Sequence, residues 1–373
     1  MKHTILHVAK YYYPVEGGIE TVTKYLVEGL TDYENIVICF STDGSTHKDE
    51  INGVTVYRVA PSFRLASQDV AFSYYRELKK VIKAHQPEVI NIHCPNPYVY
   101  PFVVKLAPKN CKIVMLWHSD ILTKGWLYKA IKPFETKALK RTDLIIATSP
   151  NYVHESSPIF RYKDKVRIVP NGVITADLEL RDGDAQRIGN IKKTYDGKKI
   201  ILFVGRHIPY KGIDCLIEAE KYIKSDCVIL IAGRGPQTDR LKAMATSDRI
   251  VFLGKVSNEE LRCLYHAADI FGFASVTKQE AFGVALAEAM YCRCVPVTFT
   301  LVGSGVNWVS VNGVTGEQVA LRDVKAYAAA VDKILGDEEL AKKYAEAAHQ
   351  RVEDLFTDEK SVAAADAVFK ELI

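Results

Sequence analysis

The feature that most constrains the fold of this chain is a repeated alternation of short apolar runs with longer stretches of helical spacing. The runs are rich in β-branched residues, and stretches such as GGIETVTKYLVEGL lie between them. In chain order the runs are TILHVA, NIVICF, VTVYRV, EVINIH, KIVMLWH, DLIIATS, IILFVGR, CVILIAG, RIVFLG, IFGFAS and CVPVTF. Apolar strands that alternate with helices predict parallel sheets covered on both faces, which is an α/β fold.

A polar segment, TADLELRDGDAQRIGNIKKTYDGKK, interrupts this alternation after VRIVPNGV. The 373 residues are enough for two or three domains, each with its own core. We therefore predict two similar α/β domains, 1–172 and 198–356, joined by a linker region at 173–197. Ligands of such sheets gather at the carboxyl ends of the strands, so we expect the site in a cleft between the two domains.

Basic residues are concentrated in the first half of the chain. Residues 1–172 contain 23 Lys and Arg against 16 Asp and Glu, a net charge of +7, and the remainder has 26 against 29, a net charge of −3. The segment 124–141, KGWLYKAIKPFETKALKR, mixes six basic residues with aromatic and aliphatic ones. It fits a helix on an anionic membrane surface, or a solvated helix whose aromatic residues belong to the core. Pro133 interrupts its periodicity.

The N-terminal stretch MKHTILHVAKYYYP lacks the long apolar core of a signal peptide. The longest apolar runs are also shorter than the roughly 20 residues of a bilayer span, and we therefore expect a cytoplasmic protein. Eight cysteines are present without the paired spacing of a metal site, which favours reduced structural thiols over zinc or a disulfide.

Three strand ends contain residues suited to an anionic ligand. Gly17 and Gly18 precede a predicted helix, where backbone N–H groups can approach an anion, although a plain turn is the alternative. Arg206 and Lys211 follow the run IILFVGR and suit a diphosphate, although surface charges are the alternative. His118 ends the run KIVMLWH at the edge where ligands gather, although many histidines are only structural.

The stretch QEAFGVALAEAM, at 279–290, places Glu288 in an almost wholly apolar predicted helix. Because a buried carboxylate without a partner is costly, Glu288 requires one. The partner is either the hydroxyls of a ligand or a basic residue of the core. Gly283 marks the start of this helix, so the N–H groups of Phe282 and Gly283 are available to ligand oxygens.

Together, GG at 17–18, RHIPYKG at 206–212, Glu280 with Glu288, and IVPNGV at 168–173 resemble the retaining glycosyltransferases of family 4. The resemblance extends over the whole chain. The loop TLVGSGVNWVS is similar to that of the members that build O-antigen and other surface polysaccharides. It implies the GT-B fold, in which two Rossmann-like domains with parallel sheets face a central cleft. The N-terminal domain would bind the acceptor and the C-terminal domain the nucleotide sugar. A helix in 357–373 would return to the N-terminal domain.

The resemblance also implies roles for particular residues. Arg206 and Lys211 would neutralise the donor diphosphate as its bond to the sugar breaks. Glu280 would hold the donor sugar, Glu288 would accept hydrogen bonds from the ribose, and His118 would stabilise the transition state at the sugar. The catalytic residues so implied are His118, Arg206, Lys211 and Glu280. The implied donor site also includes Gly17, Gly18, Gly235, Val256, Phe282, Gly283, Val284 and Glu288.

The implied activity is metal-independent and needs no cofactor beyond the nucleotide-sugar co-substrate, GDP-mannose or a UDP-sugar. A hexosyl or N-acetylhexosaminyl unit would pass to a glycan acceptor linked to a lipid diphosphate, on the inner face of the cytoplasmic membrane, with the protein bound peripherally to its anionic surface. Nucleic acid is not expected as a partner, and the oligomeric state is open. A GT-B sugar-nucleotide epimerase, which needs further carboxylates, and a non-catalytic sugar-nucleotide-binding protein are the alternatives.

Two features depart from the pattern of the family, and a third matches a motif of a different fold. Arg293 occupies a place where the family usually has glycine, and GSGVNW at 303–308 replaces the usual GG-x-x-E. The DGD at 182–184 superficially matches a DxD metal motif of another glycosyltransferase fold. Because it lies in the polar segment away from any strand end, we interpret it as a solvated loop.

Overall fold

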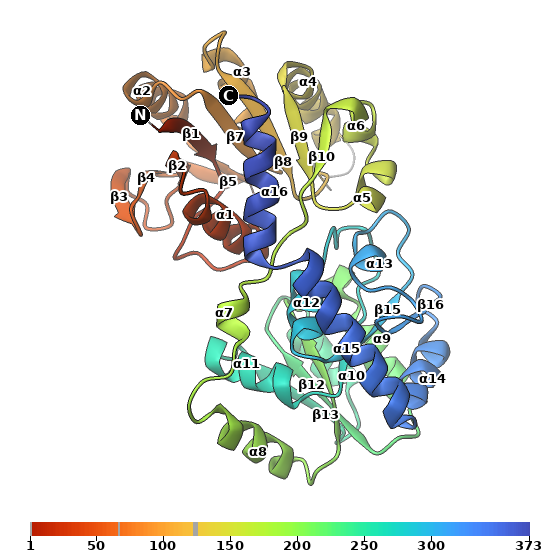
Figure 1. The fold of residues 1–373 in the computed structure, drawn as a ribbon. Coiled ribbons are helices and arrows are strands. Elements are labelled where there is room, and N and C mark those ends of the chain that lie inside the picture. Colours follow the sequence, from red (N-terminus) through yellow and green to blue (C-terminus); the bar gives the residue numbers. More distant parts are fainter. Residues whose placement is uncertain (1, 66–67, 122–125) are drawn as a thin grey trace. The chain divides into compact units, whose positions relative to one another are not determined.

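The computed structural model describes residues 2–65, 68–121 and 126–373, and the chain forms two compact units (Figure 1). The first unit comprises the residues up to Asn171 together with Asp358–Ile373, and the second comprises Gly172–Thr357. The chain therefore passes from the first unit to the second and back again.

The first unit is built on an eight-stranded sheet of order β10-β9-β8-β7-β1-β2-β4-β3. Neighbouring strands are parallel except for β3, which runs antiparallel to β4 at the edge. The strands are β1 (His3–Val8), β2 (Tyr33–Phe40), β3 (His47–Ile51), β4 (Val54–Val59), β7 (Val89–Cys94), β8 (Lys112–Trp117), β9 (Leu144–Ala147) and β10 (Val166–Ile168). Two further strands, β5 (Phe63–Leu65) and β6 (Gln68–Val70), pair with each other.

Helices flank this sheet. They are α1 (Gly18–Gly29), α2 (Tyr74–His85), α3 (Tyr100–Leu106), α4 (Trp126–Arg141), α5 (Pro150–Glu155), α6 (Ser157–Phe160), the short η1 (Lys163–Lys165) and α16 (Asp358–Lys370). The last of these packs on α1: the Tyr25 and Ser361 hydroxyl oxygens are 3.1 Å apart, and a Cβ atom on Gly29 would lie 2.6 Å from Val362. Among the helices of the described ranges, none combines the length and apolar character that a bilayer crossing needs.

The second unit has a six-stranded parallel sheet of order β13-β12-β11-β14-β15-β16. The strands are β11 (Lys199–Val204), β12 (Cys227–Ala232), β13 (Ile250–Gly254), β14 (Ile270–Phe273), β15 (Val295–Phe299) and β16 (Glu317–Val319). The helices are α7 (Thr175–Leu178), α8 (Asp184–Thr194), η2 (Pro209–Lys211), α9 (Ile213–Glu220), α10 (Thr238–Met244), α11 (Asn258–Ala267), α12 (Val284–Tyr291), α13 (Val306–Val309), α14 (Val324–Leu335) and α15 (Glu338–Leu355).

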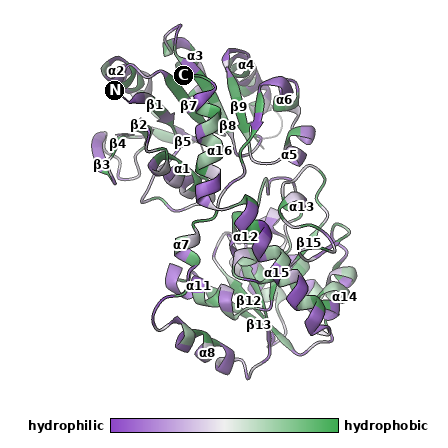
Figure 2. Ribbon diagram, in the orientation of Figure 1, coloured by the Kyte–Doolittle hydropathy of each residue, from purple (hydrophilic) through white to green (hydrophobic). Residues whose placement is uncertain are grey.

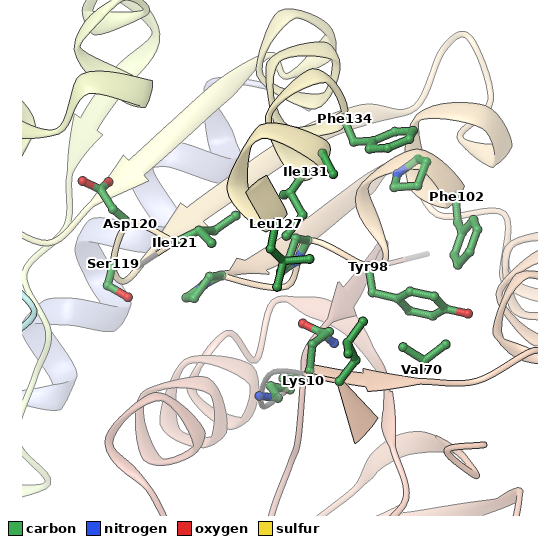
Figure 3. A pocket seen from close by; sticks show the side chains of 16 residues that line it. Lys10, Val70, Tyr98, Phe102, Ser119, Asp120, Ile121, Leu127, Ile131 and Phe134 are labelled. Atoms are coloured by element: carbon green, nitrogen blue, oxygen red, sulfur yellow. The ribbon is translucent and has the colours of Figure 1, made fainter. Parts of the chain in front are cut away.

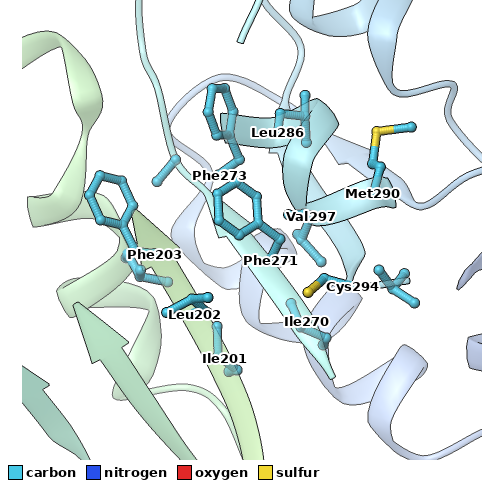
Figure 4. Close-up of a cluster of buried hydrophobic side chains, with 14 of the residues drawn as sticks. Ile201, Leu202, Phe203, Ile270, Phe271, Phe273, Leu286, Met290, Cys294 and Val297 are labelled. Carbon is cyan, nitrogen blue, oxygen red and sulfur yellow. The ribbon is translucent and has the colours of Figure 1, made fainter. Parts of the chain in front are cut away.

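Apolar side chains of the second unit meet where β11, β14 and α12 come together (Figure 4). Phe203, Phe271, Phe273 and Leu286 belong to this core, and all four are buried. Figure 2 shows apolar residues concentrated on the strands and hydrophilic ones on outer helices such as α8 and α15. This distribution is the one expected of parallel strands covered by helices.

The predicted α/β class with two parallel sheets is confirmed. Each of the eleven apolar runs forms a strand. The sequence HKDEI, which forms β3, was not expected to be a strand, because four of its five residues are polar and none of the five is buried. An edge strand that faces solvent shows no apolar alternation.

The segment 173–197 differs from the linker that we expected. It contains α7 and α8, belongs to the second unit, and packs on α11. The interpretation of DGD as a solvated loop is wrong for Asp184, which is fully buried at the start of α8. There the Nε of Arg262 donates to Asp184 Oδ2 at 2.7 Å. The ion pair with a buried arginine on α11 thus explains how the carboxylate of Asp184 can be buried, although the polar composition of its segment predicted exposure to solvent.

The structure shows how two residues that stood out in the sequence, Pro133 and Arg293, are accommodated. Pro133 lies inside α4, which is one continuous helix despite the interrupted periodicity. Arg293 has a φ of 66°, in the left-handed region that favours glycine. The residue that departs from the usual glycine therefore keeps the backbone conformation for which glycine is suited.

Candidate functional site

The loop after β11 brings Arg206 and Lys211 to the carboxyl edge of the second sheet. It passes close to the end of β14, because Val276 donates its N–H to the carbonyl of Tyr210 at 2.8 Å. Gly212 makes this approach possible: its φ is 63°, and a Cβ atom there would lie 2.0 Å from the carbonyl oxygen of Ala274. The glycine of RHIPYKG is thus required by the fold of the loop.

This approach places Lys211 against Glu280. The Lys211 Nζ lies 2.5 Å from Glu280 Oε2, and the Ser275 hydroxyl donates to the same oxygen at 2.9 Å. Burial lowers the pKa of Lys211, but Glu280 and Tyr210 outweigh it, so the pKa of Lys211 is raised overall. Lys211, which the sequence predicted to bind a diphosphate, is therefore a charged and largely buried ammonium group.

Arg206 lies in the same loop and is exposed. Within the described ranges, no carboxylate forms an ion pair with its guanidinium. Its charge is therefore directed to solvent at the same sheet edge, where an anionic ligand can reach it. The structure thus brings Lys211 into contact with Glu280 and places Arg206 in the same loop as Lys211.

The loop from Glu280 to Gly283 is fixed by contacts with the GSGVNW segment. The Ser304 hydroxyl donates to the carbonyl of Glu280, and Gly305 N donates to Ala281 O at 2.9 Å. Gly283 precedes α12 with a φ of 93°. Ser304 and Gly305 therefore hold the backbone of the predicted sugar-binding loop in place. The sequence, which shows only that GSGVNW differs from GG-x-x-E, did not indicate this role.

The residues around Gly283 differ in what they can offer a ligand. The Phe282 side chain is buried in the core, where its ring meets Phe356 at a centroid distance of 5.4 Å. Val284 is the first residue of α12 and is half-buried. The first N–H groups of any helix have no acceptor within it, so this segment can bind ligand oxygens through its backbone only.

Glu288 on α12 has a neutral partner. The Tyr265 hydroxyl, from α11, donates to Glu288 Oε2 at 2.8 Å. Burial raises the pKa of Glu288, and the hydrogen bond from Tyr265 only partly offsets that effect. Among the described residues, no basic side chain forms an ion pair with Glu288, so the alternative of a basic core partner is not what the structure shows, and a tyrosine hydroxyl is bonded to it instead. One signal could have pointed to Tyr265, since a buried tyrosine needs a partner for its O–H.

Gly235 and Val256 lie in neighbouring loops of the second unit. A Cβ atom on Gly235 would lie 2.5 Å from the carbonyl oxygen of His207, which itself accepts from Gln237 N at 3.0 Å. Gly235 therefore packs against the loop that contains Arg206. Val256 is half-buried in the loop after β13 and packs on the core.

Two predicted residues of the first unit lie where β1 leads into α1. Gly17 has extended backbone, and Gly18 begins the helix. A Cβ atom on Gly18 would meet no atom within 4 Å, so the packing of the protein itself does not require glycine there. The open space at the helix start is available to a ligand.

His118 follows β8 and is buried. Burial lowers its pKa to about 3, so the imidazole is neutral. Its ring stacks on His93 with a centroid distance of 5.8 Å. Among the described residues, none forms a hydrogen bond with His118 Nε2, which is an atom that a ligand could satisfy.

His93 belongs to a buried polar row that the sequence did not indicate. His7 Nδ1 lies 3.3 Å from His93 Nε2, and the Thr23 hydroxyl of α1 lies 3.0 Å from His93 Nδ1. Burial lowers the pKa of His7 to about 4 and the pKa of His93 well below its usual range. The row connects the helix that starts at Gly18 with the ring of His118. These histidines were missed because each lies inside a mainly apolar strand, next to its last residue, rather than in the loop that follows.

Metal-binding residues are not clustered in the described ranges, where no three His, Cys, Asp or Glu side chains form a group able to hold an ion. All eight cysteines are buried as free thiols. Arg206 and Lys211 both contribute positive charge at the sheet edge of the second unit.

Comparison with known proteins gives consistent results. The family described as Glycosyltransferase Family 4 matches residues 16–177, and that described as Glycosyl transferases group 1 matches residues 184–351. The chain is 29% identical over 367 residues to the O-antigen chain mannosyltransferase C of Escherichia coli, covering 96% of both. It is 29% identical over 364 residues to the D-rhamnosyltransferase WbpZ of Pseudomonas aeruginosa, covering 95% of this chain and 92% of that protein. The solved sucrose-phosphate synthase of Thermosynechococcus elongatus matches with a TM-score of 0.80 at 19% identity, covering 100% of this chain and 99% of that one.

Proposed function

The chain belongs to the family 4 glycosyltransferases of the GT-B fold, and from this membership we propose that it is a retaining hexosyltransferase that uses a nucleotide-diphosphate sugar. The observation that best supports the proposal is the pairing of Lys211 with Glu280 beside the exposed Arg206. Cations at this sheet edge suit the diphosphate, and the carboxylate suits sugar hydroxyls.

The proposed catalytic effect is electrostatic. Negative charge grows on the nucleotide diphosphate as its bond to the sugar breaks, and Arg206 and Lys211 stabilise that charge. Because these side chains supply the positive charge, turnover needs no metal ion. Glu288 accepts hydrogen bonds from the ribose, and His118 contacts the sugar as a neutral imidazole.

The donor sugar is proposed to have the manno configuration. One relative is named a mannosyltransferase and another a D-rhamnosyltransferase. D-Rhamnose is mannose without the 6-hydroxyl group, so both sugars present the same ring hydroxyls. The acceptor attacks the face that the diphosphate leaves, and a phosphate oxygen assists in removing the acceptor proton. The product therefore keeps the anomeric configuration of the donor.

The acceptor is proposed to be a glycan on a lipid diphosphate, in the assembly of O-antigen or a similar surface polysaccharide. One relative is named for the O-antigen chain, which supports a polysaccharide product. The exposed Lys129, Lys132, Lys137 and Lys140 of α4 provide a basic surface for an anionic membrane.

A donor screen followed by product analysis tests this function. Thermal unfolding is measured with GDP-mannose, UDP-glucose and UDP-N-acetylglucosamine, because a donor at a hundred times its Kd stabilises by about 2.7 kcal/mol. The stabilising donor is then incubated with a lipid-linked acceptor, with and without a chelator, and the anomeric configuration of the product is determined by NMR. Inverted product, or dependence on a metal, would contradict the proposed mechanism. An epimerised sugar nucleotide without transfer would indicate the epimerase instead.

A further inference from the structure

The first unit contains a cavity of about 490 Å³ that the proposed donor site does not use. We call it the α3–α4 cavity. Twelve of its sixteen lining residues are apolar or aromatic, among them Tyr98, Phe102, Leu127, Ala130, Ile131 and Phe134. Its volume lies within the range of about 300–1,000 Å³ that is typical of small-molecule sites. The cavity therefore suits a ligand that is mainly hydrocarbon.

The residues of α4 fall into three groups that differ in their surroundings. Leu127, Ala130, Ile131 and Phe134 follow helical spacing and line the cavity. Glu135, Ala138 and Leu139 face the core. The lysines of α4 are exposed. Because the cavity-lining residues are exposed or only half-buried, the core of the unit does not account for these apolar side chains.

Large apolar side chains are exposed beside the cavity. Leu65 and Phe134 line it and are 53% and 49% exposed, and Trp126, next to Leu127, is 77% exposed. Phe72 is 81% exposed, and its ring lies 5.9 Å from that of Phe63. Aromatic side chains exposed next to a row of lysines are typical of a surface that meets an anionic bilayer.

The four remaining lining residues are polar: Lys10, Gln68, Ser119 and Asp120. Figure 3 shows Ser119 and Asp120 on the opposite side of the cavity from Tyr98 and Phe102, with Lys10 apart from the aromatic rings. Asp120 is fixed in place, because Trp117 Nε1 donates to its Oδ1 at 2.9 Å. Ser119 directly follows His118 in the chain, so the polar end of the cavity is adjacent to a predicted catalytic residue.

We propose that the α3–α4 cavity binds the hydrocarbon chain of an amphiphilic prenyl diphosphate acceptor, with its polar head at Lys10, Ser119 and Asp120. The apolar end takes the chain, Lys10 attracts the diphosphate, and Asp120 accepts hydrogen bonds from a sugar hydroxyl. This inference rests on the proposed function in one respect, namely that the acceptor is lipid-linked. It adds the site and the residues that select a lipid acceptor over a water-soluble glycan.

Binding of a short prenyl diphosphate tests the site without any donor or turnover. Affinities for farnesyl diphosphate, farnesol and inorganic diphosphate are measured by titration calorimetry below the micelle concentration. Each methylene that leaves water tightens binding by about fourfold, so farnesyl diphosphate is expected to bind at least about a hundredfold more tightly than inorganic diphosphate. Farnesol isolates the contribution of the chain, and inorganic diphosphate isolates that of the head.

The variant Ala130→Trp fills the cavity from an exposed position on α4, so the fold is expected to survive. It should weaken farnesyl diphosphate binding at least about tenfold and leave inorganic diphosphate binding unchanged. Ile131→Gln, which places an amide in the cavity, should act in the same direction. The matched control is Ala84→Trp, at an exposed alanine of α2 outside the cavity, and it should bind like the parent protein.

Two results would overturn the inference: farnesyl diphosphate that binds no more tightly than inorganic diphosphate, or equal losses in the Ala130→Trp and Ala84→Trp variants. The outcome is separable from that of the proposed function. If farnesyl diphosphate binds as expected but no sugar nucleotide supports transfer, the lipid site stands and the transferase proposal fails. If a lipid-linked acceptor is glycosylated equally well by the parent protein and Ala130→Trp, the transferase stands and the lipid site fails.

Discussion

The ammonium nitrogen of Lys211 lies 2.5 Å from a carboxylate oxygen of Glu280, although the two residues are 69 positions apart in the chain. Both side chains are largely buried. Each is therefore the partner of the other before any donor is present. Removal of one leaves the other as a buried charge without a counter-ion, so single substitutions here affect stability as well as chemistry.

This pairing allows stability and activity to be separated with two variants. Lys211→Met should lower the free energy of unfolding by about 3–5 kcal/mol, the usual cost of breaking a buried ion pair. The double variant Lys211→Met/Glu280→Gln should recover most of that loss, because no buried charge remains, but it should stay inactive. Urea denaturation and release of nucleoside diphosphate measure the two properties. Recovery of activity in the double variant would exclude the proposed role of both residues.

Arg206 is expected to behave differently, because it is exposed and has no ion pair among the described residues. Arg206→Gln should change stability by no more than about 0.5 kcal/mol, while the transfer rate falls by about a hundredfold or more. The matched control is Arg240→Gln, an exposed arginine of α10. Comparable loss of transfer in both variants would indicate a general effect of charge rather than a contact with the diphosphate.

Glu288→Gln should weaken donor binding without destabilising the fold. Burial raises the folded-state pKa of Glu288 above its unfolded value, so its contribution to stability falls as pH rises through the folded pKa. Glutamine removes that charge and keeps an acceptor for the Tyr265 hydroxyl. The free energy of unfolding at neutral pH should therefore be equal or higher, while donor binding loses about 1.5–3 kcal/mol for hydrogen bonds to a charged group. A large loss of stability with unchanged donor affinity would favour a structural role.

The row of buried histidines predicts acid sensitivity. The folded-state pKa of His7 is about 4 and that of His118 is about 3, both below the ordinary value. The unfolded chain therefore binds protons that the folded chain does not, and stability is lost as pH falls below the unfolded pKa of about 6.5. Between about pH 7.5 and about pH 5.5, each such histidine contributes a loss on the order of 1 kcal/mol.

Urea denaturation at the two pH values measures this effect. His7→Gln should reduce the difference in unfolding free energy between them by the share of one histidine. The control is His154→Gln, at an exposed position, which should leave the difference unchanged. The same pH dependence in the parent protein and His7→Gln would show that His7 is not responsible.

The lysines of α4 predict salt-sensitive binding to anionic membranes. The parent protein should cosediment with liposomes that contain anionic lipid and dissociate as salt is raised, because exposed charges are screened. Replacement of Lys129, Lys132, Lys137 and Lys140 by glutamine should abolish this binding, at about 1 kcal/mol per residue. Exposed Lys192 and Lys193 of α8, changed to glutamine, provide the control. If the variant without the four lysines bound liposomes as well as the parent protein, the lysines of α4 would not be responsible for membrane binding.

The strands were predictable from sequence because buried parallel strands are continuous apolar runs, as CVILIA of β12 illustrates. Residues whose environment depends on distant partners were not. Asp184 looks solvated in its polar segment, and only the approach of Arg262 from α11 makes its burial possible. Likewise, the sequence showed that Glu288 needs a partner, but Tyr265 is on another helix and was not identified. Arg206 and Lys211 could be proposed from the residues alone, because they follow a strand whose carboxyl end has a fixed place in a parallel sheet. The role of Glu280 was proposed only from the family resemblance.

The return of α16 to the first unit has a consequence for synthesis on the ribosome. The second unit is one uninterrupted stretch, Gly172–Thr357, whereas the first is completed only by Asp358–Ile373. While the nascent chain grows, Tyr25 and Gly29 of α1 lack the helix that later covers them. The first unit is thus begun before the second and completed after it, and its surface on α1 stays open until Asp358–Ile373 have been synthesised.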